Sequence, residues 1–111
     1  MTAIGPTDKL FLITRRDLKP GQQAVQAAHA LTEFLMEHPE LGRCWRDASN
    51  YLALLVVDDE SSLHGLARRA VERGVRVAAF HEPDLGDALT AIAIEPAGKR
   101  VVAGLPLALQ I

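Results

Sequence analysis

The segment KLFLIT at residues 9–14 has a continuous apolar centre, and it decides the fold class. Such a run predicts a β-strand that is buried on both faces. Arg15 and Arg16 follow it, and Pro20-Gly21 marks a break. The next segment, residues 22–37, is rich in alanine, contains no Gly or Pro and stops before Pro39, which predicts a helix. A buried strand that leads into a helix is typical of α/β folds.

The same alternation continues toward the centre of the chain. Residues 40–46 can form a short second helix, and YLALLVV at residues 51–57 predicts another fully buried strand. A third helix follows, because acidic residues favour a helix start and Gly74 a helix end. The acidic start consists of Asp58, Asp59 and Glu60. The apolar stripe of the helix consists of Leu63, Leu66, Ala67, Ala70 and Val71.

The C-terminal part predicts two more strands, at residues 76–81 and 90–94, and a brief helix at residues 97–103. Only residues 82–89 connect these strands, which is too short for a helical crossover and favours antiparallel pairing. The sequence therefore predicts a three-layer α/β sandwich with a mixed four-stranded sheet flanked by helices. The apolar tail, residues 107–111, is available as a fifth, edge strand. We expect a loose leader at residues 1–8 and a single domain at residues 9–111.

Composition excludes several classes of protein. With 111 residues, 49% hydrophobic and 23% charged, and a mean hydropathy of +0.09, the chain is an ordered globular domain. It has no signal pattern and no apolar run near the ~20 residues that span a bilayer, so we expect a cytoplasmic protein without membrane association. The single Cys44, expected to be buried, rules out an internal disulfide and a multi-thiolate zinc site.

Charge and motifs narrow the chemistry further. The four histidines lack zincin spacing, so no metal or other cofactor is expected. A net charge of −2 means that a polyanion would bind a local patch, such as the one containing Arg15, Arg16 and Lys19. No P-loop, dinucleotide-binding or serine-hydrolase motif is present.

Candidate site residues gather at one edge of the predicted sheet. Ligands of α/β sheets bind outside the carboxyl ends of the parallel strands. Residues 15–22, His81 and Glu82, and the entry of the antiparallel strand at Thr90 all reach that edge. On the helix, a polar stripe runs away from it at i, i+4, i+7 and i+11, formed by Gln22, Gln26, His29 and Glu33. Taken singly, Gln22, Gln26 and His29 are more often solvated or structural residues than functional ones, while Glu82 also fits the start of a turn and Thr90 the start of a strand.

Three motifs resemble the archaeal and eukaryotic type of peptidyl-tRNA hydrolase, a family also found in bacteria. They are Arg16-Asp17-Leu18 after the first strand, Gln26-Ala27-Ala28-His29-Ala30 in the helix, and Thr90-Ala91-Ile92-Ala93-Ile94 followed by Pro96. The resemblance implies a mixed sheet flanked by helices, frequent homodimers, and hydrolysis of the ester that joins a peptide to the 3′ end of tRNA. It implies no metal.

Two positions depart from the family pattern. Gln22 follows the loop glycine, where the family usually has an active-site lysine, and Glu82 replaces the usual aspartate. We therefore predict Glu82 as the group that activates water, Thr90 as a residue that positions the water, and Gln22 or His29 as the donor to the oxyanion. Gln26, together with the basic residues Arg16 and Lys19, is predicted to bind tRNA, with Lys19 also able to supply the missing cation.

Two other functions fit the same residues. A catalytically silent relative would keep the fold and bind tRNA, another nucleotide-containing ligand or a protein partner, and Gln22 favours that alternative. A hydrolase of small esters would use the same cleft without RNA, which is compatible with the pI near 6.0.

Overall fold

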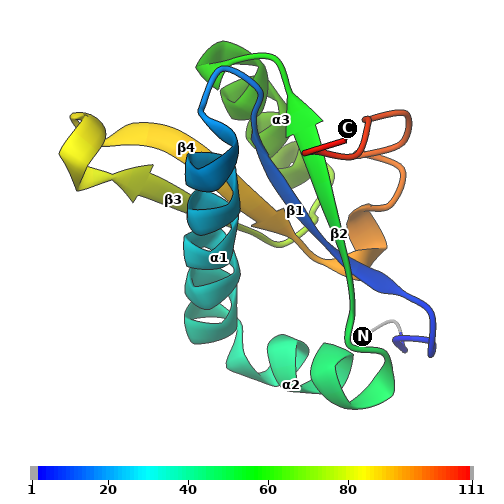
Figure 1. Cartoon of the computed structure of the whole chain (residues 1–111). Helices are drawn as coiled ribbons and strands as arrows, with labels where there is room; N and C mark the ends of the chain where they lie inside the picture. Colours follow the sequence, from blue (N-terminus) through cyan, green and yellow to red (C-terminus); the bar gives the residue numbers. More distant parts are fainter. Residues whose placement is uncertain (1–2, 111) are drawn as a thin grey trace.

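A four-stranded mixed sheet forms the middle layer of the computed structural model, which describes residues 3–110 (Figure 1). Its strands are β1 (Lys9–Arg15), β2 (Tyr51–Val57), β3 (Val77–Glu82) and β4 (Ala88–Ile94). They are ordered β2-β1-β4-β3, with β1 parallel to β2 and β4 antiparallel to both of its neighbours. The mixed sheet and the antiparallel return of β4 are confirmed.

Helices cover both faces of this sheet. Helix α1 (Pro20–Glu37) and helix α2 (Pro39–Ala48) lie on one face, and α3 (Glu60–Glu72) lies on the other (Figure 1). Side chains that alternate along β1 face the two sides in turn: Ile13 packs with Leu63 of α3, and Leu12 packs with Phe34 of α1. The predicted three-layer sandwich is therefore correct.

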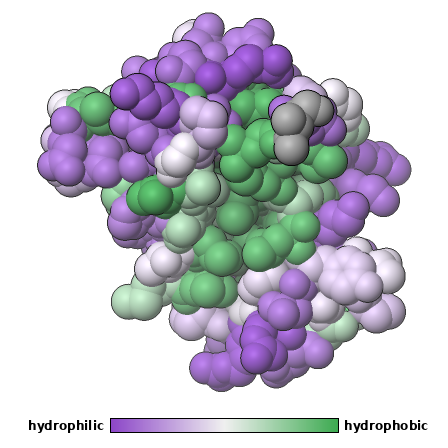
Figure 2. Space-filling view, viewed as in Figure 1, coloured by the Kyte–Doolittle hydropathy of each residue, from purple (hydrophilic) through white to green (hydrophobic). Residues whose placement is uncertain are grey.

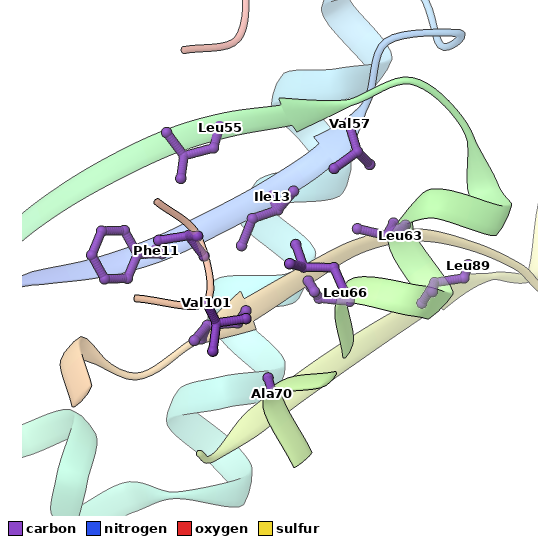
Figure 3. Packing of buried hydrophobic residues seen from close by; sticks show 12 residues of the cluster. Phe11, Ile13, Leu55, Val57, Leu63, Leu66, Ala70, Leu89 and Val101 are labelled. Atoms are coloured by element: carbon purple, nitrogen blue, oxygen red, sulfur yellow. The ribbon is translucent and has the colours of Figure 1, made fainter. Parts of the chain in front are cut away.

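The larger apolar core lies between the sheet and α3, and Figure 3 shows it from close by. Strand β1 contributes Phe11 and Ile13, and α3 contributes Leu63, Leu66 and Ala70. Residues of β1 at the centre of the strand are at most 7% exposed on either face. The prediction of a strand buried on both faces is thus confirmed for β1.

Strand β2 differs from its prediction, because it lies at the edge of the sheet. Tyr51 and Leu52 are 50% and 46% exposed, and only the C-terminal half of the strand is buried. A run of apolar residues does not distinguish a central strand from an edge strand, so full burial of residues 51–57 was wrong.

Helix ends follow the capping signals more closely than the apolar patterns. Helix α1 begins at Pro20, two residues before the predicted start, because proline fits the first helical turn. Asp59 is the N-cap of α3, and its carboxylate accepts the backbone N–H of Ser62 at 2.8 Å. Val71, predicted in the apolar stripe, is 63% exposed at the end of this helix.

The C-terminal segment is less regular than expected. Instead of a helix at residues 97–103, a 3-10 helix spans only Pro96–Gly98. Val101 and Val102 beyond it are buried in the core, but so short a segment does not sustain an α-helix by its own hydrogen bonds. The tail pairs with the outer edge of β2 through one isolated antiparallel bridge, Leu55 with Leu107, so no fifth strand forms within residues 107–110. Ile111 lies outside the described residues.

At the other end of the chain, the predicted leader lies partly outside the described residues. Within it, Ile4 packs against the core on the α1 side. Within residues 3–110, no helix combines the length and the apolarity needed to cross a membrane.

Candidate active site

Three elements bring three predicted site residues into one hydrogen-bonded chain. Gln26 projects from α1, Glu82 ends β3, and Thr90 lies near the start of β4. The Thr90 hydroxyl donates to Gln26 Oε1 at 2.6 Å, and Gln26 Nε2 donates to Glu82 Oε1 at 3.0 Å. Gln26 is 5% exposed and Thr90 fully buried, so water does not compete for these bonds.

A β-bulge in β4 turns the Thr90 side chain toward Gln26. Phe80 pairs with Ala91 and His81 with Leu89, which leaves Thr90 as an extra residue on β4. Regular alternation from Ile92, which faces α3, would also turn Thr90 toward α3. The bulge instead turns its hydroxyl to the α1 face, against Gln26.

A second buried threonine holds the backbone at this bulge. Thr14 of β1 is fully buried, and its hydroxyl donates to the carbonyl oxygen of Thr90 at 3.0 Å. The Thr90 hydroxyl also lies 3.3 Å from the carbonyl oxygen of Phe80, a longer contact than the one to Gln26. Thr14 was not among the predicted site residues; its signal in the sequence is a polar residue at the end of an otherwise apolar strand.

The hydrogen-bonded chain from Thr90 through Gln26 to Glu82 ends at an open cleft of about 320 Å³. We name it the acidic cleft; its lining residues are Gly21, Gln22, Val25, Gln26, Glu82, Asp84 and Leu85. Two carboxylates and no basic side chain are found among the described residues that line it. Glu82 is fixed there from both sides, because Oε1 accepts from Gln26 and Oε2 accepts the backbone N–H of Asp84 at 3.3 Å.

Gln22 lines the acidic cleft, as its position on the polar stripe predicts. Its side chain is exposed, and Oε1 accepts the backbone N–H of Lys19 at 3.2 Å. This bond caps the start of α1 and leaves the amide N–H groups available to a ligand.

His29 lies one helical turn beyond Gln26 on α1, beside the hydrogen-bonded chain but not in it. Its ring stacks on Phe80 of β3, with the ring centroids 4.3 Å apart and the planes 11° from parallel. It is exposed, and within residues 3–110 its imidazole makes no hydrogen bond. Phe80 therefore fixes the position of His29 by packing.

Neither of the predicted tRNA-binding cations lines the acidic cleft. Arg16 is exposed, with Nε 3.4 Å from a carboxylate oxygen of Asp58, and it lines a different hollow. Lys19 is the exposed N-cap of α1 and forms no ion pair with another described residue. Gln26, predicted with them to bind tRNA, links Thr90 and Glu82 through its two hydrogen bonds.

Arg15 has a structural role. Its guanidinium donates to both carboxylate oxygens of Asp17 and to the carbonyl oxygen of Leu89 at 3.0 Å. The hydrogen bonds with Asp17 raise the pKa of Arg15 and lower the pKa of the Asp17 carboxyl. Arg15 thus ties the end of β1 to β4 beneath the site.

Other reactive groups do not add to this site. Cys44 is exposed on α2, so its predicted burial was wrong; the helix turns it away from the core that holds Trp45. No group of three or more His, Cys, Asp or Glu side chains within residues 3–110 is arranged to hold a metal ion.

Comparison with known proteins adds two findings. The family model described as "Peptidyl-tRNA hydrolase PTH2" matches residues 8–110. A solved structure of a protein of unknown function from Agrobacterium tumefaciens strain C58 is similar in fold, with a TM-score of 0.64, 15% sequence identity, and coverage of 89% of this chain and 96% of that chain. No curated protein matches the sequence.

Proposed function

The chain belongs to the peptidyl-tRNA hydrolase PTH2 family, and from this premise we propose that it hydrolyses the ester between a peptide and the 3′ end of tRNA. The observation that carries the proposal is the hydrogen-bonded chain from Thr90 through Gln26 to Glu82 at the acidic cleft. Ester hydrolysis needs a positioned water, an acceptor for its proton and a donor to the oxyanion.

Glu82 is the proposed proton acceptor. The water oxygen attacks the ester carbonyl carbon while its proton passes to the Glu82 carboxylate, and a tetrahedral oxyanion forms. When that intermediate collapses, the bond to the ribose 3′ oxygen breaks, and this oxygen takes the proton from Glu82. A positioned group of this kind contributes about 10²–10⁴-fold to the rate.

Thr90 and Gln26 are proposed as positioning residues. Since Thr90 is buried, it reaches the water only through Gln26. The Thr90 hydroxyl donates a hydrogen bond to the amide oxygen of Gln26. This bond orients the amide so that its N–H group points toward Glu82. Gln22 then donates an amide N–H to the oxyanion, with His29 as the alternative donor, while Arg16 and Lys19 bind tRNA phosphate groups.

The test is release of peptide from an N-blocked aminoacyl-tRNA by the purified protein. Glu82→Gln keeps the size of the side chain and loses the proton acceptor, so we expect the rate to fall about 10²–10⁴-fold. Glu72→Gln, at the exposed end of α3, is the matched control and should retain the wild-type rate. Equal rates for Glu82→Gln and wild type would refute the role of Glu82.

The acidic character of the cleft favours a second candidate, a family member that binds tRNA without cleaving it. Gln22 supplies no positive charge, and the lining carboxylates of Glu82 and Asp84 disfavour a developing oxyanion. Saturable, salt-dependent tRNA binding with no peptide release above background would support this candidate over hydrolysis.

We also propose that the protein acts in the cytoplasm and, as the family resemblance implies, as a homodimer. The exposed apolar side chains of Tyr51 and Leu52 on the free part of the β2 edge support the dimer. Strand β2 carries no charged residue and no proline, the usual features that keep an edge strand from pairing with another chain.

A further inference from the structure

A second hollow, of about 400 Å³, lies on the other side of the first turn of α1. Pro20 and Gln23 line this hollow, whereas Gly21 and Gln22 line the acidic cleft. The two hollows therefore lie on different sides of the same helical turn. We name it the tail hollow, because the C-terminal tail forms its far wall beside β2 (Figure 1).

Gln23 presents a buried amide to the tail hollow. The residue is 6% exposed, and its Nε2 donates to the carbonyl oxygen of Leu18 at 2.8 Å. No described residue donates to its Oε1, so the amide keeps one acceptor and one N–H for a ligand. Glutamine amides pair with the N6 and N7 edge of adenine.

Charge distinguishes the tail hollow from the acidic cleft. Arg16 lines the tail hollow, and its exposed guanidinium is only loosely paired with Asp58, at 3.4 Å. No carboxylate is found among the described residues that line the hollow, in contrast to the two in the acidic cleft. A phosphate group is therefore attracted to the tail hollow and repelled from the cleft.

The remaining walls are mostly apolar. They are formed by Val56 of β2 and by Pro106, Leu107, Leu109 and the polar Gln110 of the tail. Leu107 and Leu109 are 53% and 43% exposed, and Figure 2 shows a continuous apolar surface over this side of the sheet. Apolar walls next to amide side chains and one cation fit a base with its phosphate.

From these contacts we propose that the tail hollow binds the 3′-terminal adenosine of tRNA, with its base at Gln23 and its 5′-phosphate at Arg16. The proposal rests on the proposed function, since it is the ester on this adenosine that is cleaved. The ribose then lies over the first turn of α1, and the ester reaches Gln22 and Glu82 in the acidic cleft.

The test is a titration with adenosine 5′-monophosphate followed by NMR, which needs no catalysis. We expect chemical-shift changes at Gln23, Leu107 and Leu109. Arg16→Ala should weaken binding about 10–100-fold, because it removes a charge-assisted hydrogen bond. Asp58→Asn should strengthen it by freeing Arg16, and Arg43→Ala, on the distant helix α2, should leave it unchanged.

Base selectivity tests the role of Gln23. The wild type should bind adenosine monophosphate more tightly than cytidine monophosphate, and Gln23→Met, of similar size, should bind the two equally. If this variant fails to fold, the shift map and Arg16→Ala still decide. Shifts at Gln26 and Glu82 in place of Gln23 would overturn the proposal, as would occupation of the hollow by an N-acetyl-leucine amide and not by the nucleotide.

These outcomes are separable from the proposed function. Nucleotide binding at Gln23 without peptide release would retain the subsite and reject hydrolysis. Peptide release that is unaffected by Arg16→Ala, with no nucleotide-induced shift at Gln23, would retain hydrolysis and reject the subsite.

Discussion

One unpaired residue in β4 determines the geometry of the candidate site. Thr90 sits at the bulge, and its hydroxyl reaches Gln26 only because the alternation of the strand shifts there. The polar stripe on α1 was readable from the sequence, and Gln22 and Gln26 do line one cleft with Glu82. The direction of the Thr90 side chain could not be predicted from the sequence, because the two-residue period of a strand does not reveal where a bulge interrupts it.

Substitution at Thr90 tests this contact. Thr90→Val keeps the shape but leaves Gln26 Oε1 buried without a donor, so we expect a loss of about 1–3 kcal/mol in the free energy of unfolding and a lower kcat. Thr90→Ser keeps the hydroxyl and should retain most of both. Urea unfolding and peptide release measure the two effects. If Val and Ser variants behave alike, the hydroxyl has no positioning role.

A lysine at position 22 tests whether a positive charge, absent from the described residues that line the acidic cleft, would speed the reaction. Gln22→Lys places an ammonium beside Glu82 and Asp84, where it can stabilise the oxyanion. Since one oxyanion donor is worth about 10²–10³-fold in kcat, we expect the variant to release peptide at least about tenfold faster than wild type. Ala28→Lys, exposed on the same helix outside the cleft, is the control of equal charge. An equal gain for Ala28→Lys would indicate a general effect of charge on tRNA binding.

At the scale of the elements, capping residues set the boundaries and apolar patterns set the faces. The strand-to-helix order predicted from residues 9–14 and 22–37 is confirmed by β1 and α1. The predicted helix at residues 97–103 was wrong because so short a segment is not stabilised by its own hydrogen bonds, even though Val101 and Val102 are buried.

The N-cap of α3 gives a pH-dependent prediction. Hydrogen bonds from Ser62 lower the pKa of Asp59 from its ordinary value of 3.8, and the bond from the backbone N–H has the largest effect. A lowered carboxyl pKa stabilises the fold above pH 3.8, and this contribution is lost as the pH falls through the folded-state value. Asp59→Ala should therefore lower the Tm at pH 7, and the difference from wild type should shrink in acid.

Thermal unfolding between pH 2 and pH 7 would measure this effect. Asp58→Ala removes the same charge from the neighbouring residue, which does not cap the helix, and should leave the Tm near the wild-type value. A deficit of Asp59→Ala that persists unchanged at pH 2 would contradict the charge-dependent part of the cap.

At the scale of the whole molecule, α1 lies between the two hollows of the proposed functional surface. The acidic cleft lies on its β3 side and the tail hollow on its β2 side, so substrate that spans both must cross the first turn of the helix. This division separates carboxylates from the arginine, and in the proposed complex it gives the two parts of the peptidyl-tRNA end different environments.

The free edge of β2 leads to a prediction about assembly. Sedimentation equilibrium should give twice the chain mass of 12.0 kDa. Leu52→Glu should produce monomers, because it places a charge on the exposed apolar edge. Val71→Glu, which alters an exposed apolar residue on α3, should leave the dimer intact. A wild-type mass of 12.0 kDa would refute the homodimer.

The sequence by itself determined the order of strands and helices, the mixed sheet and the helix that carries the polar stripe, because apolar spacing and helix-ending residues act locally. Only the tertiary structure decided that β2 is an edge, that Thr90 turns toward α1, and that Gln26 connects it to Glu82. These features depend on which distant segments pair and in what register, and no local pattern of residues encodes that choice.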